Sequence, residues 1–330
     1  YFRKICLKPQ SQNYRRLSKE NFLSNESNKQ RFINVLSNAL LEAGIETHHA
    51  SGDADCMIVS TALSKATQCP VAVVGRDTDL LVLLLYHFEP NISNVYFASG
   101  VRVWDIRGVQ AAVGPHISNN ILFGHAFGGC DSVSSLFGVG KKTPLVKLRE
   151  SSFFREQAAV FVDESRSYED IIQAGEKAAV LLYGGKDDDS LNTLRYVKYL
   201  RQLSTSTTAV DPRRLPPTAS AFKFHSMRIY FQVQVWSKLN ESVDLVPTDW
   251  GWEKTQDLLL PVCTDAAVAP EDLLHVVKCS CKTDCSSARC SCRRNGLYCT
   301  ASCGECRGMS CMNSLSMTVV ESEDVALCQD

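Results

Sequence analysis

Two aspartates beside an apolar run are the first candidates for chemistry in this chain. Asp77 and Asp79 lie in VAVVGRDTDLLVLLLY, residues 71–86, just after the apolar run that ends at Gly75. Such a run predicts a strand buried on both faces, and open α/β sheets place their chemistry at the carboxyl edge of such strands. Two carboxylates beside a dry core repel each other unless a cation lies between them. The pair therefore suggests a Mg²⁺ or Mn²⁺ site, although aspartates are also common in polar turns.

A second set of reactive side chains is a cluster of nine of the fifteen cysteines, with the spacing C-x-C-x3-C-x4-C-x-C-x6-C-x3-C-x2-C-x4-C. The cluster has almost no apolar content, so we expect zinc bound by thiolates, rather than a hydrophobic core or disulfides, to stabilise it. Three tetrahedral zinc ions need twelve bonds, so three thiolates would each bridge two metals; two separate four-cysteine sites would leave one cysteine over. The cluster consists of Cys279, Cys281, Cys285, Cys290, Cys292, Cys299, Cys303, Cys306 and Cys311.

The elements that must position the aspartates alternate between helix and strand. Helical spacing predicts a helix over residues 28–43, ended by Gly44, and a short strand over Ile45–His49 follows. Strands are also predicted over 95–98 and 101–104. The predicted inner positions of the first helix are Phe32, Val35, Leu36, Ala39 and Leu40.

A second acidic pair opens the next predicted helix. Ser51 is a candidate cap, and Asp53 and Asp55 lie in the first turn, where acids also favour the helix dipole. The predicted inner side of this helix consists of Met57, Ile58, Thr61 and Ala62.

A fifth candidate carboxylate, Asp131, lies in ILFGHAFGGCDSVSSLFGVGKK, residues 121–142. The same segment ends in Gly138, Val139, Gly140, Lys141 and Lys142. Two glycines around one apolar residue allow a tight turn between helices, whose backbone N–H groups can face a phosphate, and the two lysines add positive charge. An ordinary turn between helices is the alternative.

The rest of the chain extends this domain and then changes character. Helices are predicted over 153–162, 168–183 and 191–203, so the α/β domain spans 28–203 after a basic N-terminal segment, 1–27. A linker with one amphipathic helix over 221–239 occupies 204–277. The cysteine module spans 278–312, and residues 313–330 form a tail.

Composition leaves the partner open. The 330 residues carry a net charge of −1, so any nucleic acid must be bound by local patches, and 45% hydrophobic content suffices for a core. No apolar run approaches the roughly 20 residues needed to span a bilayer, so no membrane association is expected. Because the chain opens at Tyr1 without Met, we expect it to be part of a longer product.

The three acidic motifs resemble those of the flap-endonuclease branch of the PIN-like nuclease superfamily. The resemblance runs from Leu40 to Lys147 and rests on ASGDADCMI, VVGRDTDLLVL and GGCDSVSSLFGVGKK. It implies a parallel sheet flanked by helices, and a helix-turn-helix clamp on the DNA backbone at residues 138–142. It also implies a two-metal catalytic site lined by Asp53, Asp55, Asp77, Asp79 and Asp131.

The activity implied by this resemblance is metal-assisted hydrolysis of a phosphodiester, in which carboxylates hold two cations that activate water and stabilise the leaving oxygen. The sequence departs from the family at two places. Arg76 occupies a position where the family has an acid, and the acids of the family's first strand are expected upstream of Tyr1.

The cysteine module resembles tesmin-type CXC domains and the related chromatin modules that hold three zinc ions on nine cysteines. In that family lysines and arginines between the cysteines contact DNA phosphates, which implies binding by Lys282, Arg289, Arg293 and Arg294. The family's groove-entering tyrosine is replaced here by Arg289.

Two classes of function follow. The first is a nuclear, metal-dependent nuclease that cleaves branched or 5′-ended DNA and gains affinity from its zinc module. The second is an inactive nuclease fold that binds DNA or chromatin partners, either of mobile-element origin or acting at chromatin.

Overall fold

The structure is a computed structural model of the chain, and it describes residues 19–314 except 51, 206–209, 240–242, 257, 267–277, 283, 301–302 and 310. The described residues form a mixed α/β protein, as predicted. The chain divides into two compact units, one made of residues 1–189 with 227–250 and the other of 190–226 with 251–330. Most of the predicted basic N-terminal segment lies outside the described residues.

The first unit contains a three-stranded sheet of β1 (Val71–Val74), β2 (Val95–Ser99) and β3 (Arg102–Asp105), in the order β1-β2-β3. β1 runs parallel to β2 with Val71 opposite Val95, and β2 and β3 form an antiparallel hairpin. These three strands were predicted and are confirmed. The parallel part of the sheet is limited to the β1–β2 pair.

β1 lies at the edge of the sheet, and its two faces differ. Val73 is buried, whereas Ala72 is exposed and Val74 is 81% exposed. The prediction of a strand buried on both faces is therefore wrong. An apolar run shows that a segment is hydrophobic, but it does not show which other segments cover its faces. Among the described residues no strand pairs with the second edge of β1.

Residues 45–49, predicted to be a strand, join no ladder in the described part of the chain. Their side chains instead contact the helices on either side. Thr47 Oγ1 lies 2.8 Å from Ser37 Oγ, and Lys65 Nζ donates to Glu46 at 3.0 Å. The strand prediction is wrong because the segment has no hydrogen-bonded strand neighbour there.

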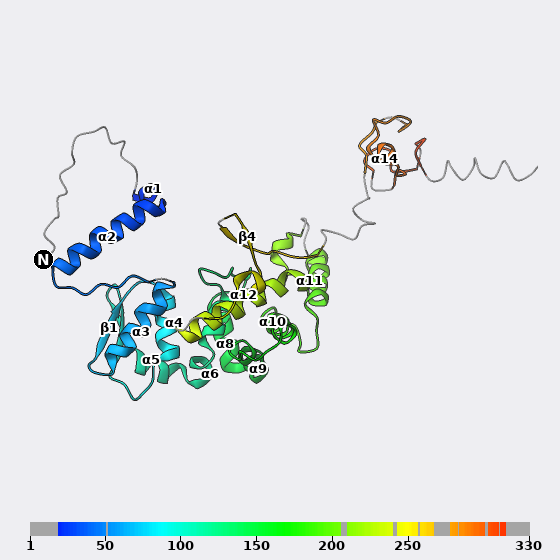
Figure 1. The fold of residues 1–330 in the computed structure, drawn as a ribbon. Helices are drawn as coiled ribbons and strands as arrows, with labels where there is room; N and C mark the ends of the chain where they lie inside the picture. The colour runs from blue at the N-terminus through cyan, green and yellow to red at the C-terminus, as the bar shows by residue number, and fades with distance from the viewer. Residues whose placement is uncertain are drawn as a thin grey trace, which may run out of the picture. The chain divides into compact units, whose positions relative to one another are not determined.

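Helices make up most of the first unit (Figure 1). The helices predicted over 28–43, 153–162 and 168–183 are present with small shifts at their ends. The bounds are α1 (Lys19–Leu23), α2 (Glu26–Glu42), α3 (Ala54–Ala66), α4 (Thr78–His87), α5 (Ile106–Val113), α6 (Pro115–Ser118), α7 (Ile121–Gly128), α8 (Lys142–Glu150), α9 (Ser152–Val160) and α10 (Tyr168–Leu182).

Two of these helices bury only part of the predicted inner side. In α2, Phe32 and Val35 are more than half exposed, and Ser37 is the buried residue. In α3, Met57 is half-buried and Ile58 is exposed. Apolar residues occupy more than one face of α3, so their spacing left the rotation of the helix open. The residues that α3 buries are Cys56, Val59, Ala62 and Ala66.

The core under α7 is aromatic. Phe123 and Phe127 of α7 pack against Phe154 of α9 and Phe161 beyond it, with ring centroids 4.7 to 6.2 Å apart. Every residue of α7 is buried. The helix therefore gives the segment that follows it a rigid support.

Helix α12 (Ala219–Lys238) confirms the helix predicted over 221–239, but much of it is buried. Its residues from Met227 onward belong to the first unit, where Tyr230 and Trp236 are 3% and 2% exposed. The Tyr230 ring stacks on Trp250 with centroids 4.5 Å apart. These residues, which the sequence assigned to a linker, are part of the core.

The second unit contains the helix α11 (Leu191–Thr205), predicted over 191–203, and the hairpin of β4 (Trp252–Thr255) and β5 (Leu258–Pro261). Short helical turns are η1 (Pro212–Arg214) and α14 (Ser291–Arg294), and η2 (Pro247–Trp250) closes the first unit.

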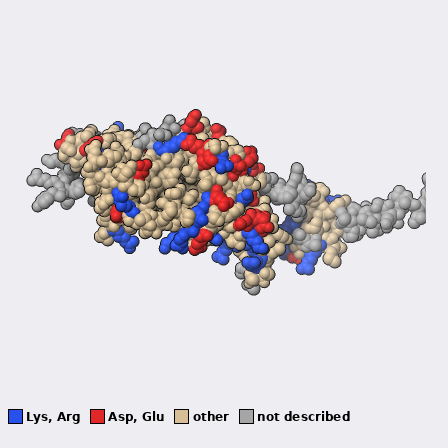
Figure 2. All heavy atoms as spheres, turned by 90° about the horizontal axis from the view of Figure 1, so that it is seen from below, with Lys and Arg blue, Asp and Glu red and all other residues tan. Residues whose placement is uncertain are grey.

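No helix in the described ranges has the length and apolar character to cross a membrane. Figure 2 shows basic and acidic side chains mixed over the face it presents, in agreement with the near-zero net charge.

Candidate metal centres

The two acidic pairs use the same local structure. Asp53 caps α3 by accepting a hydrogen bond from the backbone N–H of Asp55 at 2.9 Å, and Asp77 caps α4 through the N–H of Asp79 at 3.0 Å. In each pair the first aspartate satisfies an unpaired N–H group, and the second lies in the first turn, where the helix dipole favours an anion. Asp53, and not Ser51, is thus the cap of α3, and Ser51 lies outside the described residues.

The structure brings carboxylates of both pairs together. Ligand oxygens of Asp55, Asp77 and Asp79 all lie within 4.8 Å of one another. Burial, together with the charges of Asp53, Asp77, Asp79 and Asp131, raises the pKa of Asp55 to about 6. All five predicted aspartates therefore act on one electrostatic site, and three of them are close enough to share a cation.

Asp131 lies at the tip of a tight turn after α7. Cys130 and Val133 exchange backbone hydrogen bonds of 2.9 and 3.3 Å that close this turn. Gly129 begins it with φ of 98°, and a Cβ atom there would lie 2.7 Å from the backbone of Ser135, so only glycine fits. The Ser132 hydroxyl donates to the Gln232 side chain, which ties the turn to α12.

A histidine that the sequence reading did not select completes the site. His125 Nε2 lies 2.7 Å from Asp79 Oδ1, and the two side chains are 9% and 11% exposed. The signal available in the sequence was a single polar side chain in ILFGHAFG, a segment that is otherwise apolar.

The acidic group fits a hard divalent cation by the chemistry of its donors. Carboxylate oxygens are the ligands that Mg²⁺ and Mn²⁺ prefer, and burial together with the charges of the neighbouring aspartates raises the pKa of Asp55, so the site disfavours added negative charge. A cation among Asp55, Asp77 and Asp79 would remove that repulsion.

The cysteine module has sulfur spacings that suit zinc. A tetrahedral zinc ion with Zn–S bonds of about 2.3 Å holds its sulfur atoms about 3.8 Å apart. Cys279 Sγ lies 3.8 Å from each of the Cys285, Cys299 and Cys306 sulfurs, and Cys292 Sγ lies 3.6 Å from Cys303 Sγ. A disulfide would need about 2.05 Å, and no disulfide joins the cysteines in the described ranges.

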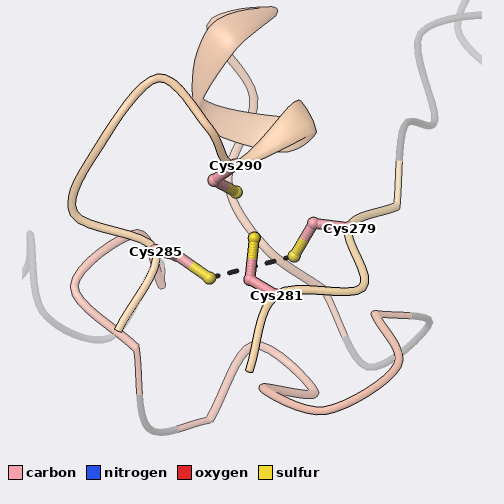
Figure 3. Close-up of side chains that lie close together, drawn as sticks. All are labelled: Cys279, Cys281, Cys285 and Cys290. Carbon is pink, nitrogen blue, oxygen red and sulfur yellow. Dashed lines mark hydrogen bonds between the residues drawn. The ribbon is translucent and has the colours of Figure 1, made fainter. Parts of the chain in front are cut away.

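The four-cysteine groups in this module overlap. One comprises Cys279, Cys281, Cys285 and Cys290, whose sulfurs face one another in Figure 3. Cys279 belongs to every group, so its sulfur is available to more than one metal. The overlap favours shared thiolates over two separate four-cysteine sites. The other two groups are Cys279, Cys285, Cys299 and Cys306, and Cys279, Cys290, Cys292 and Cys299.

Residues beyond the predicted module end also support it. Asn313, which is buried, donates from Nδ2 to Cys299 Sγ at 3.4 Å and to Leu297 O at 2.9 Å. The Cys299 N–H donates to Asn313 O at 2.7 Å. Gly308 lies so close to the Cys299 carbonyl that a Cβ would meet it at 2.5 Å. The ordered module therefore reaches Ser314 instead of ending at residue 312.

Burial makes several of these thiols poor acids without a cation. It raises the pKa of Cys285 and Cys299, whereas the backbone N–H of Gly308 lowers the pKa of Cys306. Zinc would displace the protons that the buried thiols retain, so binding should release protons.

The predicted nucleic-acid contacts are accessible but lie on different local structures. The module's basic side chains are exposed, and Arg293 and Arg294 lie on α14. Gly138 and Gly140 lie in the loop 129–141, which leads from α7 to α8, so the predicted turn has a helix only on its C-terminal side. The exposed basic residues are Lys141, Lys142, Lys282, Arg289, Arg293 and Arg294.

Comparisons with protein-family models, with curated proteins and with solved structures find no match to this chain.

Asp55→Asn should stabilise zinc-loaded protein in the absence of added Mg²⁺ or Mn²⁺. The pKa of Asp55 in the folded state is about 6, above the ordinary 3.8. Below pH 3.8 the carboxyl is protonated in the folded and the unfolded state, and its ionisation costs the folded protein no stability. As the pH rises through 6 the folded protein must carry the buried charge, and its stability falls. The gain from Asn should therefore grow between pH 5 and pH 7.5. Because the carboxyl is partly exposed, we expect on the order of 1 kcal/mol at pH 7.5, roughly 2–4 °C in Tm.

Thermal unfolding at the two pH values measures this gain. Asp163→Asn is the control, since hydrogen bonds from Ser165 lower the pKa of Asp163 and its loss should not stabilise the protein. A gain from Asp55→Asn that is the same at both pH values would contradict the electrostatic account.

Purified under reducing conditions, the chain should contain two to three zinc ions, measured by elemental analysis. Cys279→Ala should remove more zinc than Cys281→Ala, because Cys279 belongs to every four-cysteine group and Cys281 to one. Cys263→Ala, which changes an exposed thiol of the same unit outside these groups, should leave the zinc content unchanged. Less than one zinc per wild-type chain would rule out the zinc module.

Proposed function

We propose that the chain is a metal-dependent, structure-selective DNA phosphodiesterase with a PIN-like, flap-endonuclease-type domain and a zinc module that adds DNA affinity. The observation that carries the proposal is the convergence of Asp55, Asp77 and Asp79 within 4.8 Å, with Asp53 and Asp131 in electrostatic range. The sequence resemblance had named these same five residues.

The case for a cation rests on the electrostatic repulsion between the carboxylates. Several carboxylates share one partly buried site, and the protein holds them there through helix caps and a turn built on Gly129. Mutual repulsion opposes this arrangement unless positive charge is supplied. A phosphodiester is also an anion, so it could approach the acidic group only after that charge has been neutralised.

In this proposal Asp55, Asp77 and Asp79 hold the cations, and Asp131 approaches from the turn after α7. Bound Mg²⁺ or Mn²⁺ would supply an activated water and neutralise charge on the leaving oxygen. Lys141 and Lys142, exposed at the start of α8, would bind a backbone phosphate through charge.

The second candidate is a DNA- or chromatin-binding protein with an inactive nuclease fold. A specific observation favours it: Asp53 and Asp77 cap helices, so the fold has a reason to keep them without catalysis. Arg76, exposed beside Asp77, also places a positive charge near the proposed cations.

The protein should cleave branched or 5′-ended DNA with Mg²⁺ or Mn²⁺ but not with Ca²⁺, whose longer bonds and looser geometry misplace the attacking water. Asp77→Asn preserves size while removing charge, and should slow cleavage on the order of 100-fold or more. Cleavage of a labelled flap with and without Mn²⁺ measures this effect.

Lys141→Ala is the matched comparison, because it should weaken substrate affinity while leaving metal binding intact. Equal, metal-independent cleavage by wild type and Asp77→Asn would indicate a contaminant. No cleavage by either protein would favour the second candidate.

The zinc module should bind DNA through Arg289, Arg293 and Arg294, which are exposed around Cys290 and Cys292. Each arginine replaced by Ala should lower the slope of log affinity against log salt by roughly one unit, because fewer counterions are released. Anisotropy titrations of labelled DNA over a salt series measure the slope. A triple variant with an unchanged slope would show that these arginines do not contact DNA phosphates.

A further inference from the structure

We propose that His125 is a positioning residue for Asp79: it occupies one carboxylate oxygen and leaves the other to bind a divalent cation. The inference rests on the proposed metal site and deepens it, since it assigns a ligand geometry and a metal preference to that site.

The contact between the two residues is short and buried. His125 Nε2 and Asp79 Oδ1 are 2.7 Å apart, within the range of a charge-assisted hydrogen bond. A carboxylate that binds a metal is ionised and can only accept hydrogen bonds, so in the proposed metal-bound state Nε2 carries the hydrogen. Both side chains are about nine-tenths buried, and little water is available to replace this contact.

The imidazole is held in place from several directions. His125 lies on α7, where every residue is buried, and its ring packs against the Trp236 ring with centroids 5.7 Å apart. The Trp236 carbonyl is in turn 2.8 Å from His87 Nε2. The donor at Nε2 therefore has a fixed direction, which is what orienting a metal ligand requires.

Asp79 is fixed from its other side by the cap of α4. Its backbone N–H donates to Asp77 Oδ1, so the two aspartates are held in a defined relation to each other. Because Oδ1 is engaged by His125, we assign the second oxygen, Oδ2, to a cation in the group that Asp79 forms with Asp55 and Asp77.

A ligand restricted to one oxygen affects the choice of metal. Mg²⁺ and Mn²⁺ favour octahedral coordination by single oxygens at short distance, whereas Ca²⁺ takes more ligands, often with both oxygens of a carboxylate. We expect His125 to favour Mn²⁺ and Mg²⁺ over Ca²⁺ at this site. A purely structural pair would affect stability and leave this preference unchanged.

The test compares Mn²⁺ affinity, measured by electron paramagnetic resonance on the zinc-loaded chain, and its competition by Ca²⁺. His125→Phe keeps a ring but removes the donor, and should weaken Mn²⁺ binding about 10–100-fold while lowering the preference for Mn²⁺ over Ca²⁺. In His125→Gln the side-chain Nε2 is as many bonds from Cβ as in histidine. This variant should stay within about threefold of wild type, because the hydrogen bond is restored.

Two controls isolate the effect. Asp77→Asn removes one carboxylate of the acidic group, so the Mn²⁺ binding that this variant loses is the binding at that group. His225→Phe makes the same substitution at a buried histidine of the second unit and should leave Mn²⁺ affinity unchanged.

Equal Mn²⁺ affinity in His125→Phe and wild type, with binding that Asp77→Asn abolishes, would overturn the positioning role and leave the proposed function standing. No Asp77-dependent binding in wild type would overturn both. If His125→Phe does not fold, His125→Gln decides: affinity near wild type supports the role, and a loss of tenfold or more overturns it.

Discussion

The gathering of like charges at the ends of two helices is the constraint on which the first unit depends. Asp53 and Asp77 each accept a hydrogen bond from the residue two positions later, and the positive ends of α3 and α4 face the acids that follow. The caps thus offset part of the repulsion within the group. Burial and the remaining repulsion together raise the pKa of Asp55. The acidic pairs that begin α3 and α4 therefore also supply the carboxylates of the candidate metal site.

Local patterns in the sequence predicted most of what is local in the structure. The Asp-x-Asp pairs, the hairpin over 95–105, the long helices and the cysteine spacing all depend on residues close in the chain, and all are found. Of the five candidate aspartates, Asp55, Asp77 and Asp79 lie within 4.8 Å of one another, and the parallel part of the sheet is a single strand pair. Spacing along the chain thus identified carboxylates and cysteines that lie close together in the structure.

Features that depend on packing between distant segments were not predicted. The faces of α2 and α3, the exposed side of β1 and the burial of α12 are set by neighbours far away in sequence. The same holds for His125 and Asn313, each of which acts through a contact made only after folding: one with Asp79, the other with Cys299. A hydrophobic pattern identifies a surface to be covered, but it does not identify the covering residues.

The four residues of β1 have a consequence for solubility. Within the described ranges no strand pairs with their outer edge, which lies beside the exposed Val74, and an unpaired edge can template the growth of aggregates. Pro70 directly precedes the strand and the charged Arg76 follows it after Gly75. Proline and charge at these flanks are gatekeepers that keep an apolar segment short and discourage its stacking. Arg76, which is exposed, thus places a positive charge next to this edge, where charge opposes the stacking of strands.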